Sequence, residues 1–147
     1  MLNVKTGNSI NPNAAAAGKE AAAMVKENLT DMKMAFVYSG VQYDQKELLA
    51  SIASELPGVP LIGNTSFTGV ITPDGYISAD DGFTGIMALS DADLTVGVAG
   101  MPKEGTARQT GHKVAEKALK AAGRTDAPAY FYMAAPSGEE EYYLKGI

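Results

Sequence analysis

The chain has 147 residues, a hydrophobic fraction of 46% and a formal net charge of −5, which fits one globular domain with an ordinary core. The acidic balance and the scattered lysines exclude a basic nucleic-acid-binding stripe and argue against a surface for anionic membranes. The absence of cysteine excludes disulfides, thiolate chemistry and zinc sites that use cysteine ligands.

The N-terminal residues show no basic segment followed by an apolar core, so they do not form a secretory signal pattern. The alanine-rich run over residues 14–25 is interrupted by Lys19 and Glu20 and is too short to span a bilayer. Together with the missing cysteine, this predicts a cytoplasmic protein in a reducing compartment.

The first half of the chain predicts alternating strands and helices. Asn11-Pro12 is typical of a helix start, with asparagine as the N-cap and proline as the first helical residue, and the helix is expected to reach about Leu29. Asp44 predicts the start of a second helix, which Pro57-Gly58 ends. Strands are expected over residues 2–6, 33–39 and 59–62. The first helix should bury mostly small residues: Ala14, Ala17, Gly18, Ala21, Met24, Val25 and Asn28.

After Gly63 the pattern changes to short strand-like runs separated by polar turns. Runs of this kind cover residues 67–72, 76–78, 82–90 and 94–100. The turns between them are Pro73-Asp74-Gly75, Asp80-Asp81 and Asp91-Ala92-Asp93. Short polar turns join antiparallel neighbours, so this stretch predicts an antiparallel meander.

The last part predicts a helix, a strand and a helix. Thr106 and Gln109 form a capping-box pattern for a helix to about Ala122, and a strand is expected over residues 129–134. Ser137, with Glu140 three residues on, predicts the N-cap of a final helix that runs to the end of the chain. We expect this chain to be the N-terminal portion of a longer protein.

The expected fold class is therefore α/β (α+β mixed), with a mixed parallel and antiparallel sheet and flanking helices in a single domain over residues 1–147. The element order is β-α-β-α-β, then an antiparallel meander, then α-β-α.

Polar side chains follow three of the expected strands, and parallel strands would bring these strand ends to one edge of the sheet, where ligands bind in open α/β folds. The candidate ligand-binding residues are Ser39, Gln42, Tyr43, Asn64, Thr65, Ser66 and Ser137. Helix N-termini at Asp44 and Ser137 favour an anion, whereas the carboxylates of Asp44, Glu139 and Glu140 favour an amine. An amino acid carries both groups. The alternative is that these residues only build turns, with Asp44 serving its own helix.

Several segments resemble the N-terminal region of FIST domains. They are Ala35-Phe36-Val37-Tyr38-Ser39, Leu56-Pro57-Gly58-Val59-Pro60-Leu61-Ile62-Gly63 and the stretch from Asn64 to Gly75, which fits G-x-[ST]-[ST]-x-x-G-x-[IV]-x-x-x-G when Gly63 is included. This resemblance implies a prokaryotic sensory domain that binds a small ligand such as an amino acid and acts on a signalling output protein or domain. It implies a sensor and not an enzyme, and complete FIST regions are longer than this chain.

Enzyme chemistry would depend on His112, the one histidine in the chain. A Ser/Thr-dependent hydrolase would need His112 as its base, and the nucleophile-elbow pattern G-x-S-x-G is absent, so we name no catalytic residue. Some FIST-type proteins are associated with haem and nitric-oxide sensing, for which His112 would be the proximal ligand. A half-exposed surface histidine is the simpler interpretation.

Metal binding is not expected, because Asp80-Asp81 and Asp91/Asp93 fall in turns without an EF-hand pattern. No phosphate-binding loop of the G-x-x-x-x-G-K-[ST] type occurs. A third alternative is a structural or dimerising module, in which a homodimer would form through an exposed sheet edge or apolar patch.

Overall fold

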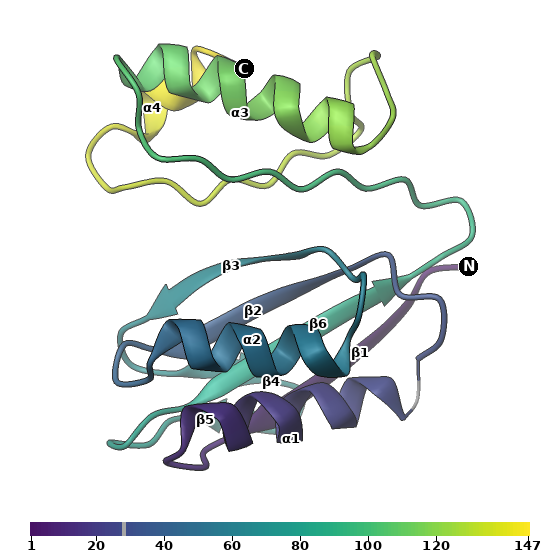
Figure 1. The fold of residues 1–147 in the computed structure, drawn as a ribbon, viewed down its shortest axis with the longest axis vertical. Coiled ribbons are helices and arrows are strands. Elements are labelled where there is room, and N and C mark those ends of the chain that lie inside the picture. Colours follow the sequence, from purple (N-terminus) through teal and green to yellow (C-terminus); the bar gives the residue numbers. More distant parts are fainter. Residues whose placement is uncertain (28) are drawn as a thin grey trace. The chain divides into compact units, whose positions relative to one another are not determined.

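The computed structural model describes residues 1–27 and 29–147, and the chain divides into two compact units, Met1–Leu94 and Thr95–Ile147. Figure 1 shows the elements of both units. The expected fold class is confirmed, because a mixed parallel and antiparallel sheet is combined with helices. The expectation of a single domain stays a prediction, and each unit is described by itself below.

The first unit holds a four-stranded sheet in the order β1-β6-β2-β3. Strand β2 (Met34–Gly40) pairs in parallel with β3 (Leu61–Ser66) on one side. On its other side, β2 pairs antiparallel with β6 (Thr84–Ser90), and β6 in turn pairs antiparallel with β1 (Asn3–Ser9). The parallel pairing of β2 and β3 confirms the prediction that this part of the chain forms parallel strands joined by a helix.

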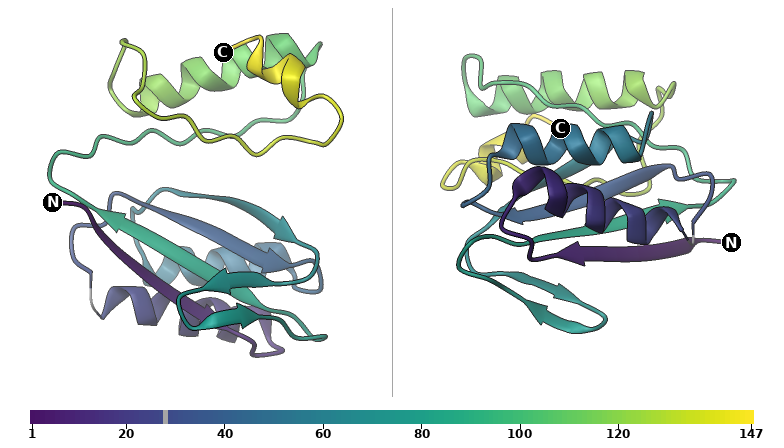
Figure 2. Two further views of the ribbon diagram at one scale, coloured as in Figure 1. Left: turned by 180° about the vertical axis from the view of Figure 1, so that it is seen from behind. Right: turned by 60° about the horizontal axis from the view of Figure 1, so that its bottom comes forward.

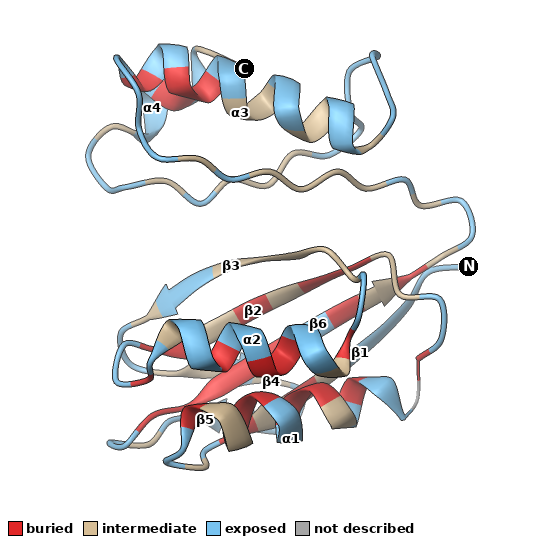
Figure 3. Cartoon of the chain, in the orientation of Figure 1, coloured by how far each residue is buried: buried red, intermediate tan, exposed pale blue. Residues whose placement is uncertain are grey.

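Helices α1 (Ala14–Lys26) and α2 (Gln45–Glu55) pack against each other and cover one face of this sheet (Figure 2). Their buried residues face the sheet and each other in Figure 3. The close approach depends on Gly18, where an added Cβ would lie 2.0 Å from the Ser51 hydroxyl oxygen. The small residues of α1 therefore belong to the core, as expected, whereas Met24, which was expected on the same face, is 43% exposed. The core of this unit comprises Ala14, Ala17, Ala21, Ala22, Val25, Leu29, Ala35, Val37, Tyr43, Leu48, Ile52, Leu56, Ile86 and Ala88.

The expected meander is wrong in its pairing. Strands β4 (Val70–Thr72) and β5 (Gly75–Ile77) form a separate two-stranded hairpin, and β6 leaves it to enter the main sheet between β1 and β2. Strand β6 buries five of its seven residues. A strand at the centre of a sheet buries much more apolar surface than a strand at the edge of a hairpin. The apolar residues of β6 therefore favour its place in the main sheet.

The helix starts of the first unit are partly as expected. Asp44 is the N-cap of α2, and its carboxylate accepts hydrogen bonds from the backbone amides of Lys46 and Glu47 at 2.9 and 3.1 Å. For α1 the expected N-cap is wrong. Asn13 is the cap, and the Asn11 side chain instead accepts from the amide of Asn13 at 3.0 Å. Helix α1 also ends earlier than expected, at Lys26, and Asn28 lies outside the described residues.

The second unit holds α3 (Ala107–Ala121) and the short α4 (Glu140–Leu144). The capping box of Thr106 and Gln109 is confirmed. Ser137 is not the N-cap of the last helix: Glu139 is, without a side-chain capping bond, because Gly138 adopts a φ of +91° and its amide donates to Glu140. The strands expected over 94–100 and 129–134 form no ladder among the described residues, since a strand requires a hydrogen-bonding neighbour.

Among the described residues, no helix combines the length and the apolar character needed to cross a bilayer.

Candidate functional site

The parallel pairing of β2 and β3 brings two of the three expected polar clusters to one edge of the sheet. The last residues of the two strands lie side by side in the pairs Tyr38 with Asn64, Ser39 with Thr65 and Gly40 with Ser66. The loop 41–44 leaves this edge and enters α2 at Asp44. We define the carboxyl edge as the ends of β2 and β3 together with this loop.

Ser39 is buried at the carboxyl edge and is occupied by a contact within the protein. Its hydroxyl donates to the side-chain oxygen of Gln45 at 2.8 Å. The amide group of Gln45 donates to the backbone oxygens of Gly40 and Tyr43 at 2.9 and 3.1 Å. Ser39 and Gln45 therefore hold the loop 41–44 in place. Sequence reasoning missed Gln45, although a side chain at the first position of α2 is well placed to reach the preceding loop.

Tyr43 is also buried, with 5% of its surface exposed, and its hydroxyl donates to the backbone oxygen of Asn11 at 2.5 Å. Its ring lies against Gly82, where an added Cβ would be 2.2 Å from a ring carbon. Burial, with a smaller effect from the negative charge of Glu20, raises the pKa of Tyr43. Tyr43 thus anchors the loop 41–44 to the segment that precedes α1.

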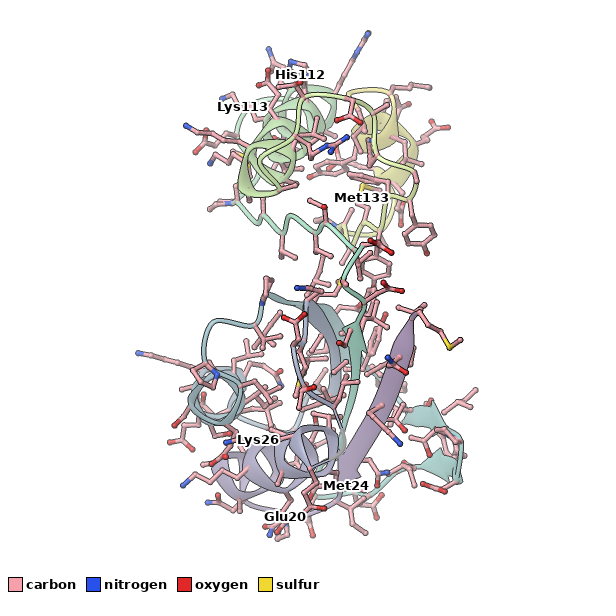
Figure 4. The ribbon with its side chains drawn as sticks, turned by 90° about the vertical axis from the view of Figure 1, so that its right-hand side faces the viewer. Glu20, Met24, Lys26, His112, Lys113 and Met133 are labelled. Carbon is pink, nitrogen blue, oxygen red and sulfur yellow. The ribbon has the colours of Figure 1, made fainter. Side chains whose placement is uncertain are left out.

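Glu20 completes this network from α1, where Figure 4 labels it. Its carboxylate accepts a hydrogen bond from the hydroxyl of Ser9 at 2.5 Å and another from the side-chain amide of Asn11 at 2.8 Å. These two bonds lower the pKa of Glu20. The sequence held no local signal for this group of contacts, because its members come from three separate segments.

The exposed polar side chains of the carboxyl edge are Gln42, Asp44, Asn64 and Thr65, and Val41 is exposed beside them. The side-chain amide of Asn64 donates to the backbone oxygen of Thr65 at 3.0 Å. Ser66 is half-buried, and its hydroxyl donates to the backbone oxygen of Gly69 at 2.5 Å, which closes the polar loop after β3. The edge therefore presents amide and hydroxyl groups on a framework that is held by internal hydrogen bonds.

Ser137 is exposed and lies in the second unit, so its membership of the same site stays a prediction.

His112 lies on α3 and extends toward solvent beside Lys113 (Figure 4), with 62% of its side chain exposed. Its Nδ1 is 3.2 Å from the backbone oxygen of Gly146, and its Nε2 is 3.5 Å from a carboxylate oxygen of Glu116. The shallow hollow beside it is lined by Arg108, Gln109, His112, Lys113, Lys145 and Gly146. A haem needs an apolar slot, and these charged neighbours do not fit one.

The hydrolase alternative would join Ser66 of the first unit to His112 of the second. It would also require the Ser66 hydroxyl to leave its bond to Gly69. This alternative stays a prediction. Within residues 1–27 and 29–147, no three histidine, aspartate or glutamate side chains gather as a metal site would require.

Comparison with known proteins gives one family match. The family model of the FIST N domain matches residues 33–147. No curated protein matches the chain. Among solved structures, the crystal structure of a cyanuric acid hydrolase from A. caulinodans is similar to 86% of this chain, with 13% sequence identity and a TM-score of 0.44. This chain spans 40% of the length of that structure. The residues matched by the family model include all of β2, β3 and the loop 41–44.

Proposed function

This chain belongs to the FIST family of sensory domains in signalling proteins, and we propose that it binds a free amino acid or a closely related metabolite. The proposed site is the carboxyl edge of the first unit. A sensor of this kind acts on a signalling output protein or domain, which would read whether the site is occupied.

The observation that carries the proposal is the parallel register of β2 and β3. This register places the exposed side chains of Asn64 and Thr65 beside the C-terminal end of β2. The loop 41–44 and α2 follow directly from that end of β2. Ligands of α/β sheets bind outside the carboxyl ends of parallel strands, in the crevice between such loops. Amide and hydroxyl groups there recognise a small polar ligand without reacting with it.

The charges around the loop 41–44 support a ligand that carries both an amine and a carboxylate. The N-terminus of α2 is the positive end of a helix dipole and favours a carboxylate by about 0.3–1 kcal/mol at an exposed position. The exposed carboxylate of Asp44 stands at the same helix end and favours an amine. Free amino acids offer this pair of charges within a few ångströms.

Ser39 and Tyr43 have a supporting role in this proposal. Both are buried and bonded within the protein, so they set the position of the loop and do not touch the ligand. Gln42, Asn64, Thr65 and the backbone around Ser66 make the contacts.

A thermal-shift screen of the full chain against the free amino acids tests the proposal. A ligand present at about 100 times its Kd stabilises the folded state by roughly 2.7 kcal/mol, which gives a readable shift in melting temperature. For the ligand that responds, we expect Thr65→Val to weaken binding about tenfold, equivalent to about 1.4 kcal/mol, because the substitution removes a hydroxyl and keeps the shape of the side chain.

Thr68→Val is the matched control, since Thr68 is an exposed threonine in the loop that follows β3. Equal effects of the two substitutions on Kd would contradict a site at Thr65. The absence of any amino-acid response would contradict the proposed ligand class.

A further inference from the structure

Two exposed apolar side chains stand at the carboxyl edge, one after each strand. Gly40 and Ser66 are the last residues of β2 and β3, and they are partners in the parallel register. Val41 and Phe67 follow them directly in the chain, so both side chains start from neighbouring strand ends. Val41 is 58% exposed and Phe67 is 84% exposed. Single exposed apolar residues are ordinary on a protein surface, but this pair adjoins the proposed ligand site.

The segment that carries Phe67 is fixed by its neighbours and not by the phenylalanine ring. The hydroxyl of Ser66 donates to the backbone oxygen of Gly69 at 2.5 Å. The hydroxyl of Ser78 donates to the backbone oxygen of Thr68 at 2.6 Å. Because most of the surface of Phe67 stays in water, the fold gains little from an aromatic residue at this position.

The loop 41–44 is fixed in the same manner. The side-chain amide of Gln45 donates to the backbone oxygen of Gly40 at 2.9 Å, directly before the loop begins. The side-chain oxygen of Gln42 also lies against this strand end, since an added Cβ at Gly40 would be 2.3 Å from it. The strand end that precedes Val41 thus presents a polar group and an apolar side chain next to each other.

The segments that build this part of the edge carry no charge. Residues 34–43 and 60–73 contain no lysine, arginine, histidine, aspartate or glutamate. Asp44 is the one charged residue of the carboxyl edge, and in the proposed function it favours the amine of the ligand. A charged ligand side chain would therefore lose hydration without gaining an ion pair. An apolar side chain against Val41 and Phe67 would instead remove apolar surface from water.

We propose that the ligand is an amino acid with an uncharged, apolar side chain, and that Val41 and Phe67 determine this specificity. The inference rests on the proposed function and adds the class of ligand side chain to it. The amide and hydroxyl groups of the carboxyl edge bind the amine and the carboxylate that all amino acids share. Val41 and Phe67 contact the side chain, in which amino acids differ.

Isothermal titration calorimetry of the full chain tests the specificity with two sets of ligands. The apolar set is valine, leucine, isoleucine, methionine and phenylalanine, and the other set is threonine, asparagine, glutamine, aspartate and lysine. We expect the tightest apolar ligand to bind about tenfold more tightly, or better, than every member of the other set. A polar or charged ligand that binds as tightly overturns this inference and leaves the proposed function standing. The absence of binding by every amino acid overturns both.

Substitutions at the pair test which residues determine the specificity. Phe67→Ser and Val41→Ser should each raise the Kd of the tightest apolar ligand about tenfold, because the apolar contact is lost. Ile71→Ser is the matched control, since Ile71 is 89% exposed on β4, and it should leave this Kd unchanged. Equal Kd values for Phe67→Ser and Ile71→Ser contradict the assignment.

Two measurements without ligand separate binding from other causes. The melting temperatures of the three variants should equal that of the wild type, because all three side chains are mostly exposed. Sedimentation velocity reports the oligomeric state. A smaller oligomer in Phe67→Ser together with an unchanged Kd would assign the pair to a contact between copies of the chain, and it would overturn the proposal.

Discussion

Tyr43 and Ser39 show how side chains with ligand-binding chemistry can serve the fold instead. Both are buried beside the carboxyl edge, and each hydroxyl donates to an acceptor within the protein. Their neighbours Gln42 and Thr65 have similar chemistry and are exposed. In the proposed site, burial therefore separates the residues that support the loop from those that would contact a ligand, and the type of residue does not reveal this difference.

Tyr43→Phe should lower the free energy of unfolding by about 1 kcal/mol, because the backbone oxygen of Asn11 loses its donor. The raised pKa of Tyr43 adds a pH dependence. Above the ordinary tyrosine pKa of 10.0, the unfolded chain loses this proton before the folded chain does, so stability falls as pH rises through the folded pKa. Tyr43→Phe should lack the part of the loss of stability above pH 10 that comes from this tyrosine. Urea unfolding of both proteins at neutral pH and above pH 10 measures the difference.

Tyr76→Phe is the matched control, because Tyr76 is 59% exposed on the hairpin. A loss of stability in Tyr76→Phe equal to that in Tyr43→Phe would contradict the role of the bond to Asn11.

At the scale of elements, helix starts follow from a few neighbouring residues. Asp44 and Thr106 were predicted as N-caps, and both accept hydrogen bonds from backbone amides of the helix they open. The expected N-caps Asn11 and Ser137 each stand two residues before the N-cap that the structure shows, Asn13 and Glu139. At those places Asn13 and the Gly138–Glu140 contact determine where the helix begins.

Asp44→Ala should lower the free energy of unfolding by about 1 kcal/mol, because the amides of Lys46 and Glu47 lose their acceptor. Asp44→Asn keeps a side-chain oxygen at the cap and should stay close to the wild-type value in the same chemical denaturation. Comparable losses in both variants would indicate that the charge of Asp44, and not its capping bonds, stabilises α2.

The order of the strands in the sheet could not be predicted from local sequence patterns. The runs that became β4, β5 and β6 were correctly expected to be extended, but β6 pairs with β1 and β2 and not with the hairpin. The hydroxyl of Thr84 at the start of β6 donates to the backbone oxygen of Tyr38, far away in the sequence, at 3.1 Å. Turn residues and the alternation of polar and apolar residues do not predict hydrogen bonds between such distant segments.

At the scale of the whole molecule, the two units differ in how much apolar surface they bury. Every residue of the main core cluster lies between Ala14 and Ala88, in the first unit. In the second unit, the buried apolar side chains of the described residues are Ala107 and Tyr143. Because burial of apolar surface is the main stabilising contribution, the second unit should be the less stable of the two.

Native-state hydrogen exchange in low denaturant should therefore show a smaller opening free energy for the amides of α3 than for those of α1. Ile52→Ala, which opens a cavity in the core of the first unit, should cost about 2–5 kcal/mol and lower the opening free energy of α1. Val114→Ala on α3, which is half-buried, is the comparison in the second unit. Identical opening free energies for α1 and α3 would contradict a difference between the units.

The sequence by itself determined the class of fold, the parallel pair β2–β3, the helix starts at Asp44 and Thr106, and the family. These features depend on residues within a few positions of one another or on a pattern along one segment. Only the tertiary structure decided that β6 enters the centre of the sheet, that Tyr43 is bound to Asn11, and which polar residues of the carboxyl edge face solvent. These outcomes depend on burial and on backbone pairing between distant segments, where the hydrogen-bonding partner of a group is set by the fold and not by its neighbours in the chain.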